Sequence, residues 1–202
     1  MSAVSDVTQG EIIAVDGKQL RRSHDKSNGK AAIHMVSAWA TSNRLVLGQV
    51  KVDEKSNEIK AIPALLRRLD LHRCLVTVDA MGCQVDIANL IVDGGGDYLF
   101  SLKGNQSNLH DDVVLLFDDL EESGYNAYEH DYDKTVGKDH GRIEVRHCWT
   151  ISDPALVQPM RGAERFEGLQ TLVRVRSERY VGDEHTIEDR HFISGATTYS
   201  GL

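Results

Sequence analysis

The sequence contains no long hydrophobic run and has a deficit of positive charge. No apolar stretch among its 202 residues approaches the ~18 residues that a membrane-spanning helix needs. The N-terminus lacks the basic start and apolar core of a secretory signal. Lys and Arg number 23 against 31 Asp and Glu, which gives a net charge of −8. This balance argues against binding nucleic acid by overall charge, although it permits a local basic patch. We expect a cytoplasmic protein without membrane association.

Several catalytic signatures are also missing. There is no Walker-type phosphate loop and no G-x-S-x-G elbow, which removes the two commonest sequence arguments for nucleotide hydrolysis and serine esterase chemistry. The nine histidines form neither H-x-x-x-H nor H-E-x-x-H, so zinc hydrolase chemistry is not indicated. The three cysteines, Cys74, Cys83 and Cys148, form no C-x-x-C pair. We expect buried, reduced thiols.

What the sequence does contain is a pair of aspartates, each placed at the end of a short apolar run. Residues 12–15 are followed by Asp16 and Gly17, and residues 74–78 are followed by Asp79 and Ala80. Such short β-branched runs bounded by turn residues predict buried strands. A carboxylate there is held at the rim of a sheet, and two on neighbouring strands can share a divalent metal. Either aspartate alone would more simply be a turn former or a helix cap.

The order of predicted elements supports a mixed α/β fold. Strands are predicted at 12–15, 31–40, 44–52, 74–78 and 98–102, and helices at about 56–69, 84–92 and 108–122. The order βββαβαβα predicts a mixed sheet flanked by helices. It is the order of the ribonuclease H-like fold, in which the strands of Asp16 and Asp79 lie side by side. We therefore assign residues 11–122 to a ribonuclease H-like core.

The second part of the chain has a different pattern. Residues 143–151 and 169–177 alternate between apolar and polar side chains. Residues 186–194 are a further strand candidate, and Gly182 with Asp183 predicts a hairpin turn before them. We assign residues 123–194 to a C-terminal β-rich insertion and residues 195–202 to a disordered tail.

Five strings along the chain resemble one family. They are Ala-Val-Asp-Gly-Lys at 14–18 with Leu-Arg-Arg at 20–22, Glu-Lys-Ser-Asn-Glu-Ile at 54–59, Val-Asp-Ala-Met-Gly-Cys-Gln at 78–84, Leu-Lys-Gly-Asn-Gln at 102–106 and His-Gly-Arg-Ile-Glu at 140–144. In this order they resemble the H-repeat-associated branch of the bacterial DDE transposases, insertion-sequence enzymes with a ribonuclease H-like core. The resemblance runs from about residue 11 to residue 194.

The resemblance implies metal-assisted cleavage and transfer of DNA strands at transposon ends. In the family, two Asp and one Glu hold two Mg²⁺ ions, for which Mn²⁺ can substitute. Carried over by motif, Asp16 and Asp79 are the first two catalytic, metal-binding acids. The implied partners are DNA and either a second copy or a full-length transposase.

The third acid does not match. Relatives carry the Glu near the C-terminus in a pattern resembling W-x-I-E, and neither Trp39 nor Trp149 is followed by such a string. Relatives also carry a helical region before the first Asp, so the chain looks truncated at both ends. Glu144 could substitute, but an Arg142–Glu144 pair on one face of a strand is the simpler interpretation. Arg174 and Glu178 have the offset of the family's Arg–Glu pair, yet their segment predicts a strand.

Six residues are candidates for contact with DNA: Lys18, Arg21, Arg22, Lys103, Gln106 and Arg142. Lys18, Arg21 and Arg22 could instead lie in a solvated surface loop. The string at 102–106 could instead be a turn that requires Gly104.

Two main hypotheses of function follow. The first is a catalytic-domain fragment of a DDE transposase, and the second is a non-catalytic remnant that binds DNA or full-length transposase without cutting. An unrelated Mg²⁺-dependent nuclease of the same fold is a third.

Overall fold

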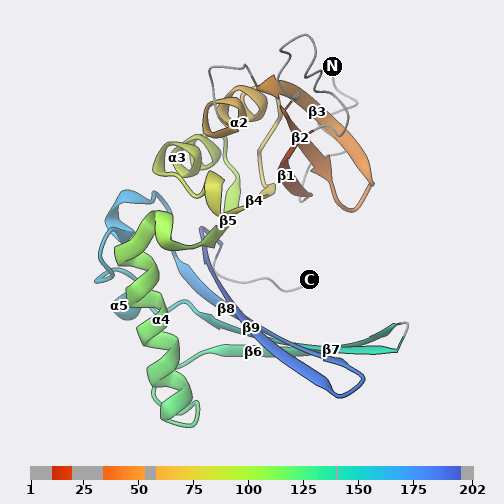
Figure 1. The fold of residues 1–202 in the computed structure, drawn as a ribbon. Coiled ribbons are helices and arrows are strands. Elements are labelled where there is room, and N and C mark those ends of the chain that lie inside the picture. Colours follow the sequence, from red (N-terminus) through yellow and green to blue (C-terminus); the bar gives the residue numbers. More distant parts are fainter. Residues whose placement is uncertain (1–10, 20–33, 53–57, 140, 197–202) are drawn as a thin grey trace, which may run out of the picture. The chain divides into compact units, whose positions relative to one another are not determined.

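The computed structural model describes residues 11–19, 34–52, 58–139 and 141–196. The chain forms two compact units, Met1–Phe100 and Ser101–Leu202 (Figure 1). The predicted boundary lies at residue 122. The compact units divide earlier because the helix that precedes residue 122 packs on the strands that follow it. Among the described residues, no helix is both long enough and apolar enough to cross a membrane.

The first unit is a mixed sheet with helices on one face. Its strands lie in the order β3-β2-β1-β4-β5. Strand β1 pairs antiparallel with β2 and parallel with β4, while β2 pairs antiparallel with β3 and β4 parallel with β5. The expected meander followed by alternating strands and helices is confirmed. The elements are β1 (Ile12–Gln19), β2 (His34–Ala40), β3 (Leu45–Val52), α2 (Glu58–Leu66), β4 (Leu75–Val78), η1 (Ala80–Gly82), α3 (Val85–Asp93) and β5 (Asp97–Leu102).

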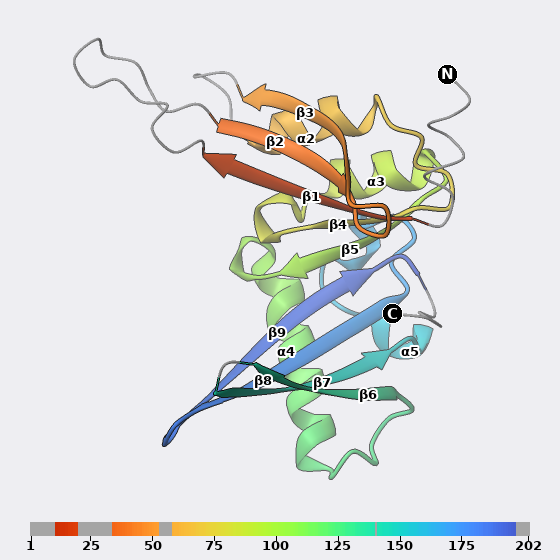
Figure 2. The same cartoon turned by 90° about the vertical axis from the view of Figure 1, so that its right-hand side faces the viewer.

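One face of this sheet forms the core of the unit. The register sets Val15 beside Ala38 and Val78, and Val78 beside Phe100, so the buried side chains of four strands point the same way. Helices α2 and α3 cover that face (Figure 2). Apolar residues at helical spacing provide their buried sides. These residues are Ala61, Ile62, Leu65, Leu66, Ile87, Ala88 and Ile91.

The C-terminal ends of helices α3 and α2 can be compared with the predicted ends. Helix α3 stops at Gly94, and Gly95 adopts the left-handed backbone conformation with φ 73°. Glycine takes this conformation without steric cost, which is why the predicted stop occurs there. Helix α2 ends at Leu66, three residues earlier than predicted, and residues 67–69 form a turn.

The second unit consists of a helix and an antiparallel sheet. Helix α4 (Ser107–Glu122) follows η2 (Gly104–Gln106), and the strands lie in the order β9-β8-β7-β6. The strands are β6 (Asp131–Asp139), β7 (Arg142–Ile151), β8 (Thr171–Val181) and β9 (Glu184–Ser194), with α5 (Pro154–Val157) and η3 (Ala163–Arg165) between β7 and β8. The predicted β-rich character and the hairpin at Gly182, with φ 59°, are confirmed. Residues 197–202, predicted as a tail, lie outside the described residues.

Strand β6 was not predicted from the sequence. Its residues 131–138 are all exposed, because it lies at the edge of the sheet and pairs only with β7 within its unit. An exposed edge strand needs no apolar alternation, and the charged residues of this one are typical of such edges.

None of the three cysteines forms a disulfide bond. Cys74 and Cys83 are buried and Cys148 is half-buried, so the expected burial holds for two of the three. Burial raises the pKa of the Cys83 thiol to about 12, which leaves it protonated and unreactive at neutral pH.

Candidate functional site

Asp16 lies within a strand rather than at its end. Strand β1 continues to Gln19 because β2 pairs with it as far as His34 opposite Gln19. The prediction that the strand stops before Asp16 is therefore wrong. On the other side of β1, however, the parallel pairing with β4 stops at Val15 opposite Val78. Asp16 is the first residue of β1 beyond that ladder, and its side chain is exposed.

Asp79 directly follows β4 and caps the short helix η1. Its Oδ1 atom accepts hydrogen bonds from the backbone N–H groups of Met81, at 3.1 Å, and Gly82, at 3.3 Å. The capping role that the sequence suggested for a lone aspartate is thus present. Both bonds end on Oδ1, so neither occupies Oδ2, and the side chain is exposed. Capping leaves a carboxylate oxygen of Asp79 available to a ligand.

The two aspartates are brought together by the strand pairing. Val15 and Val78 are partners in the parallel ladder, and Asp16 and Asp79 are the next residues on the two strands. Since side chains alternate along a strand, the Asp16 side chain lies on the face of β1 opposite Val15, while Asp79, just beyond β4, caps η1. The prediction that the two strands are adjacent is confirmed, and that the two aspartates share a metal stays a prediction. Exposed carboxylates are ligands that Mg²⁺ and Mn²⁺ prefer, and such ions keep several waters or phosphate oxygens besides.

Glu144, the alternative third acid, forms ion pairs with two neighbouring arginines. It lies on β7 in the second unit, where Arg146 donates a hydrogen bond of 2.7 Å to Oε1 and Arg142 lies 3.9 Å from Oε2. The described part of the chain contains no group of three or more His, Cys, Asp or Glu residues that could hold a metal ion. The structure thus contains the Arg142–Glu144 pair that the sequence predicted for one face of a strand.

The candidate DNA-binding residues fall in different places. Lys18 is exposed and lies two residues beyond Asp16 on β1, hence on the same face. Arg21 and Arg22 lie outside the described residues. Lys103 precedes η2, Gln106 is its last residue and Arg142 begins β7, all three in the second unit. Lys103 is exposed and Gln106 half-buried.

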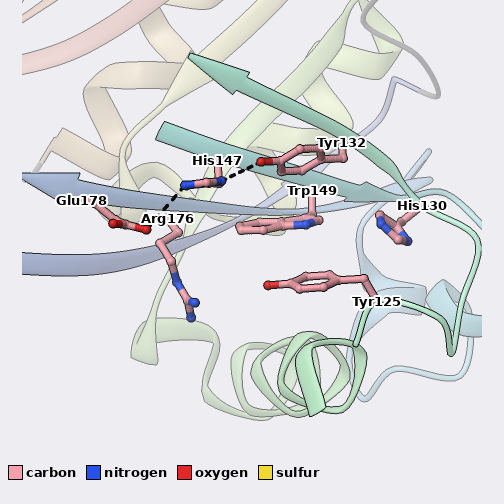
Figure 3. A pocket seen from close by; sticks show the side chains of 7 residues that line it. All are labelled: Tyr125, His130, Tyr132, His147, Trp149, Arg176 and Glu178. Carbon is pink, nitrogen blue, oxygen red and sulfur yellow. Dashed lines mark hydrogen bonds and ion pairs between the residues drawn. The ribbon is translucent and has the colours of Figure 1, made fainter. Parts of the chain in front are cut away.

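An aromatic cavity in the second unit was not predicted. It has a volume of about 450 Å³ and is lined by Tyr125, His130, Tyr132, His147, Trp149, Arg176 and Glu178. Figure 3 shows the ring of Tyr125 facing that of Trp149, with Arg176 and Glu178 toward one end and His130 toward the other.

The rings are held in place by stacking and hydrogen bonds. The rings of Tyr125 and Trp149 are nearly parallel, at 7° and 5.4 Å between centroids, and His147 and Trp149 are stacked at 5.5 Å. The Tyr132 hydroxyl and His147 Nδ1 lie 2.7 Å apart in a hydrogen bond. This wall offers flat apolar faces beside the polar groups of Arg176 and Glu178, an arrangement that suits a planar ligand with polar edges.

A fully buried arginine stands behind the cavity. Arg174 Nη1 donates to the backbone oxygen of Phe117 at 3.2 Å and to Glu121 Oε2 at 3.0 Å. Its guanidinium carbon lies 4.5 Å from the centre of the Trp149 ring. These partners offset the cost of burying the charge. Arg176 binds Glu121 and Asp189 as well, and its hydrogen bond to Glu121 lowers the pKa of that carboxyl. Helix α4 is thereby tied to the sheet.

The sequence contained only part of the signal for this cavity. His147 and Trp149 alternate on β7, and Tyr132 is the cross-strand partner of Trp149. The alternation could have placed the first two on one face. The contribution of Tyr125 depends on where the chain turns after α4, and that of Arg176 on the β7–β8 register.

Comparison with known proteins identifies the family. The family model for the transposase DDE domain matches residues 8–179. The chain belongs to the DDE transposase family. The resemblance that the five strings predicted is confirmed, including the H-repeat-associated branch.

The similar proteins of this transposase family come from bacteria. The chain is 42% identical over 185 residues to the "Uncharacterized protein in dhlA 3'region" of Xanthobacter autotrophicus, covering 92% of the chain and 60% of that protein. It is 52% identical over 136 residues to the "H repeat-associated putative transposase YhhI" of Escherichia coli, covering 67% and 35%. It is 50% identical over 146 residues to the "Putative transposase YncI" of Escherichia coli O157:H7, covering 72% and 37%. The chain thus spans only about a third to three fifths of the length of these relatives.

The buried histidine next to the arginine network yields a pH prediction. Burial lowers the pKa of His191 to about 4, and the nearby His110 adds to this. An unfolded His titrates near ~6.5, so between these values the unfolded chain binds the extra proton and stability falls as the pH falls. We expect the wild type to lose about 2 kcal/mol between pH 7.5 and pH 5 through this group. In His191→Phe this part of the loss should vanish.

Urea denaturation of both proteins at the two pH values measures this difference. The exposed His72 provides the control, and His72→Gln should behave like the wild type. Parallel losses of stability in the wild type and His191→Phe would contradict the assignment.

Proposed function

We propose that this chain carries part of the catalytic core of a DDE transposase, with a ribonuclease H-like first unit. The proposed parent reaction is divalent-metal-dependent cleavage and transfer of DNA strands in DNA transposition, inside the bacterial cytoplasm. The observation that supports the proposal is the β1–β4 pairing, which ends at Val15 opposite Val78, one residue before Asp16 and Asp79. Family membership supports the reaction class.

In this proposal Asp16 and Asp79 hold Mg²⁺, with Mn²⁺ as a substitute. Their hard carboxylate oxygens suit these ions, and Asp79 keeps Oδ2 clear of its capping bonds. A bound ion would activate the attacking oxygen and stabilise the leaving one. The protein's own contribution is to fix the two carboxylates on paired strands at the sheet surface. Because the described residues hold no cluster of three such ligands, we propose that the third carboxylate comes from elsewhere, either in the parent protein or in a partner transposase.

The same observation favours a second candidate function. Two carboxylates hold a metal more loosely than three, and two-metal chemistry requires fixed geometry. A chain limited to Asp16 and Asp79 could bind DNA or full-length transposase without cutting. The first candidate rests on family membership and the aspartate pair. The second rests on the lack of a three-ligand cluster among the described residues.

DNA is the proposed partner of both candidates. Lys18, with Arg21 and Arg22 further along the chain, is proposed to contact phosphates beside the aspartates. Lys103, Gln106 and Arg142 are proposed contacts in the second unit. The net charge of −8 makes weak, salt-sensitive binding the expectation.

The aromatic cavity suits an additional contact to unpaired bases. Arg176 is already paired with Glu121 and Asp189, and Glu178 contacts His147 and His185. The cavity therefore offers little uncompensated charge to a phosphate. Bases stack on aromatic rings whatever their sequence, and the exposed ring of Tyr132 is accessible for this.

Metal binding is the first test. Neighbouring carboxylates repel one another, and a bound cation relieves that repulsion. We expect Asp16→Asn and Asp79→Asn each to weaken Mn²⁺ binding by about tenfold or more, as loss of a ligand should. Titration calorimetry measures it, with Asp86→Asn on the exposed side of α3 as the control. The aspartate site is refuted if Asp16→Asn binds Mn²⁺ like the wild type.

Plasmid nicking in the presence of Mg²⁺ separates the two candidates. We expect the isolated chain to nick DNA poorly or not at all, because the third ligand is not supplied. If Glu144 were the third acid, nicking would be robust and Glu144→Gln would abolish it as fully as Asp79→Asn. A robust activity with that pattern would overturn the placement of the third acid.

The base contact predicts a selective loss of affinity. Tyr132→Leu should weaken binding of a single-stranded oligonucleotide by roughly tenfold, because stacking contributes about 1–3 kcal/mol per base. Fluorescence anisotropy measures this at fixed salt. Tyr128→Leu is the matched control, since Tyr128 lies outside the cavity lining. Equal affinities of the two variants would argue against a base site in the cavity.

A further inference from the structure

The orientation of the Asp79 carboxylate depends on the backbone that follows it. The N–H groups of Met81 and Gly82 both donate to Oδ1 of Asp79. A second set of bonds holds this backbone, since Gly82 N–H donates to the Asp79 carbonyl at 3.1 Å and Gln84 N–H to the Gly82 carbonyl at 2.8 Å. The tight turn thus fixes Oδ1, and neither of the two bonds to the carboxylate uses Oδ2.

Gly82 is the residue that allows this turn to pack. A Cβ atom added there would lie 2.1 Å from Cγ1 of Val78 and 3.1 Å from Cδ1 of Ile62. The backbone of Gly82 lies outside the left-handed region, so the restriction is one of space and not of conformation. Val78 is buried and β-branched, with little freedom at χ1. The strain from an added methyl would therefore fall on the backbone of Gly82.

The location of this contact connects it to the site. Val78 precedes Asp79 in the chain and is paired with Val15, so its backbone is held by the sheet. Gly82 is the more easily displaced partner, and its N–H is one of the two donors to Asp79. A side chain at residue 82 would therefore weaken the hydrogen bond from the residue 82 N–H to Oδ1 of Asp79 and leave that carboxylate less well oriented.

We propose that Gly82 is a positioning residue for Asp79 as a metal ligand. The absence of a side chain at Gly82 lets the turn seat its N–H groups against Oδ1, which presents Oδ2 to the ion. This rests on the proposed function, in which Asp79 holds a divalent metal. Glycine at this place sets metal affinity as well as packing.

The test measures Mn²⁺ affinity in the full chain by titration calorimetry, well below each variant's melting temperature. We expect Gly82→Ala to raise the Kd by about tenfold, the usual cost of losing support for a ligand. Val78→Ala removes the methyl groups that the new Cβ would meet, so the double variant Val78→Ala, Gly82→Ala should recover most of the affinity. Val78→Ala alone should bind like the wild type. A role in stability alone would lower the melting temperature and leave the Kd unchanged.

A second variant keeps the proposal testable if Gly82→Ala does not fold. Met81→Pro removes the other N–H donor to Asp79 at an exposed position in the first turn of η1, where proline is tolerated. It should also raise the Kd. Unchanged affinity in the folded Gly82→Ala, or in Met81→Pro, would overturn the positioning role while Asp79→Asn still weakens binding. If Asp79→Asn itself binds Mn²⁺ normally, the proposed function fails and the positioning role fails with it.

Discussion

The short parallel ladder between β1 and β4 is the constraint on which the candidate site depends. Only residues 12–15 of β1 pair with residues 75–78 of β4. The ladder is buried on one face by α2 and α3, and the apolar partners Val15 and Val78 leave no freedom to slip. A shift of one residue would turn every buried side chain to the exposed face. The core packing of the first unit thus sets the position of Asp16 and Asp79 to within one residue.

The second unit is organised by side chains instead. A single buried guanidinium, that of Arg174, contacts the carbonyl of Phe117, the carboxylate of Glu121 and the ring of Trp149. A charge buried in this way is tolerated only with partners, so the network fixes α4 against the sheet. The aromatic cavity inherits its rigidity from that arrangement. In our proposal, strand cleavage and base contact are therefore supported by different kinds of interaction.

The structure also bears on which residue could be the third metal-binding acid. Glu144 is engaged by Arg142 and Arg146, and the described residues contain no cluster of three metal ligands. The relatives are longer than this chain, so the proposal assigns the missing ligand to another part of a transposase. In our proposal, this chain contributes the pair of aspartates.

The sequence by itself determined the order of the elements in the first unit, the family and the two aspartates as strand-associated carboxylates. Periodicity and turn residues such as Gly94 and Gly182 act over a few neighbouring positions, so these features could be predicted locally. Tertiary structure decided that β1 continues past Asp16, because its partner β2 does. It also decided that Arg174 is buried and that Tyr125 joins Tyr132, Trp149 and Arg176 around one cavity. Those residues meet only through strand register and the packing of α4, which depend on contacts between segments distant in the chain.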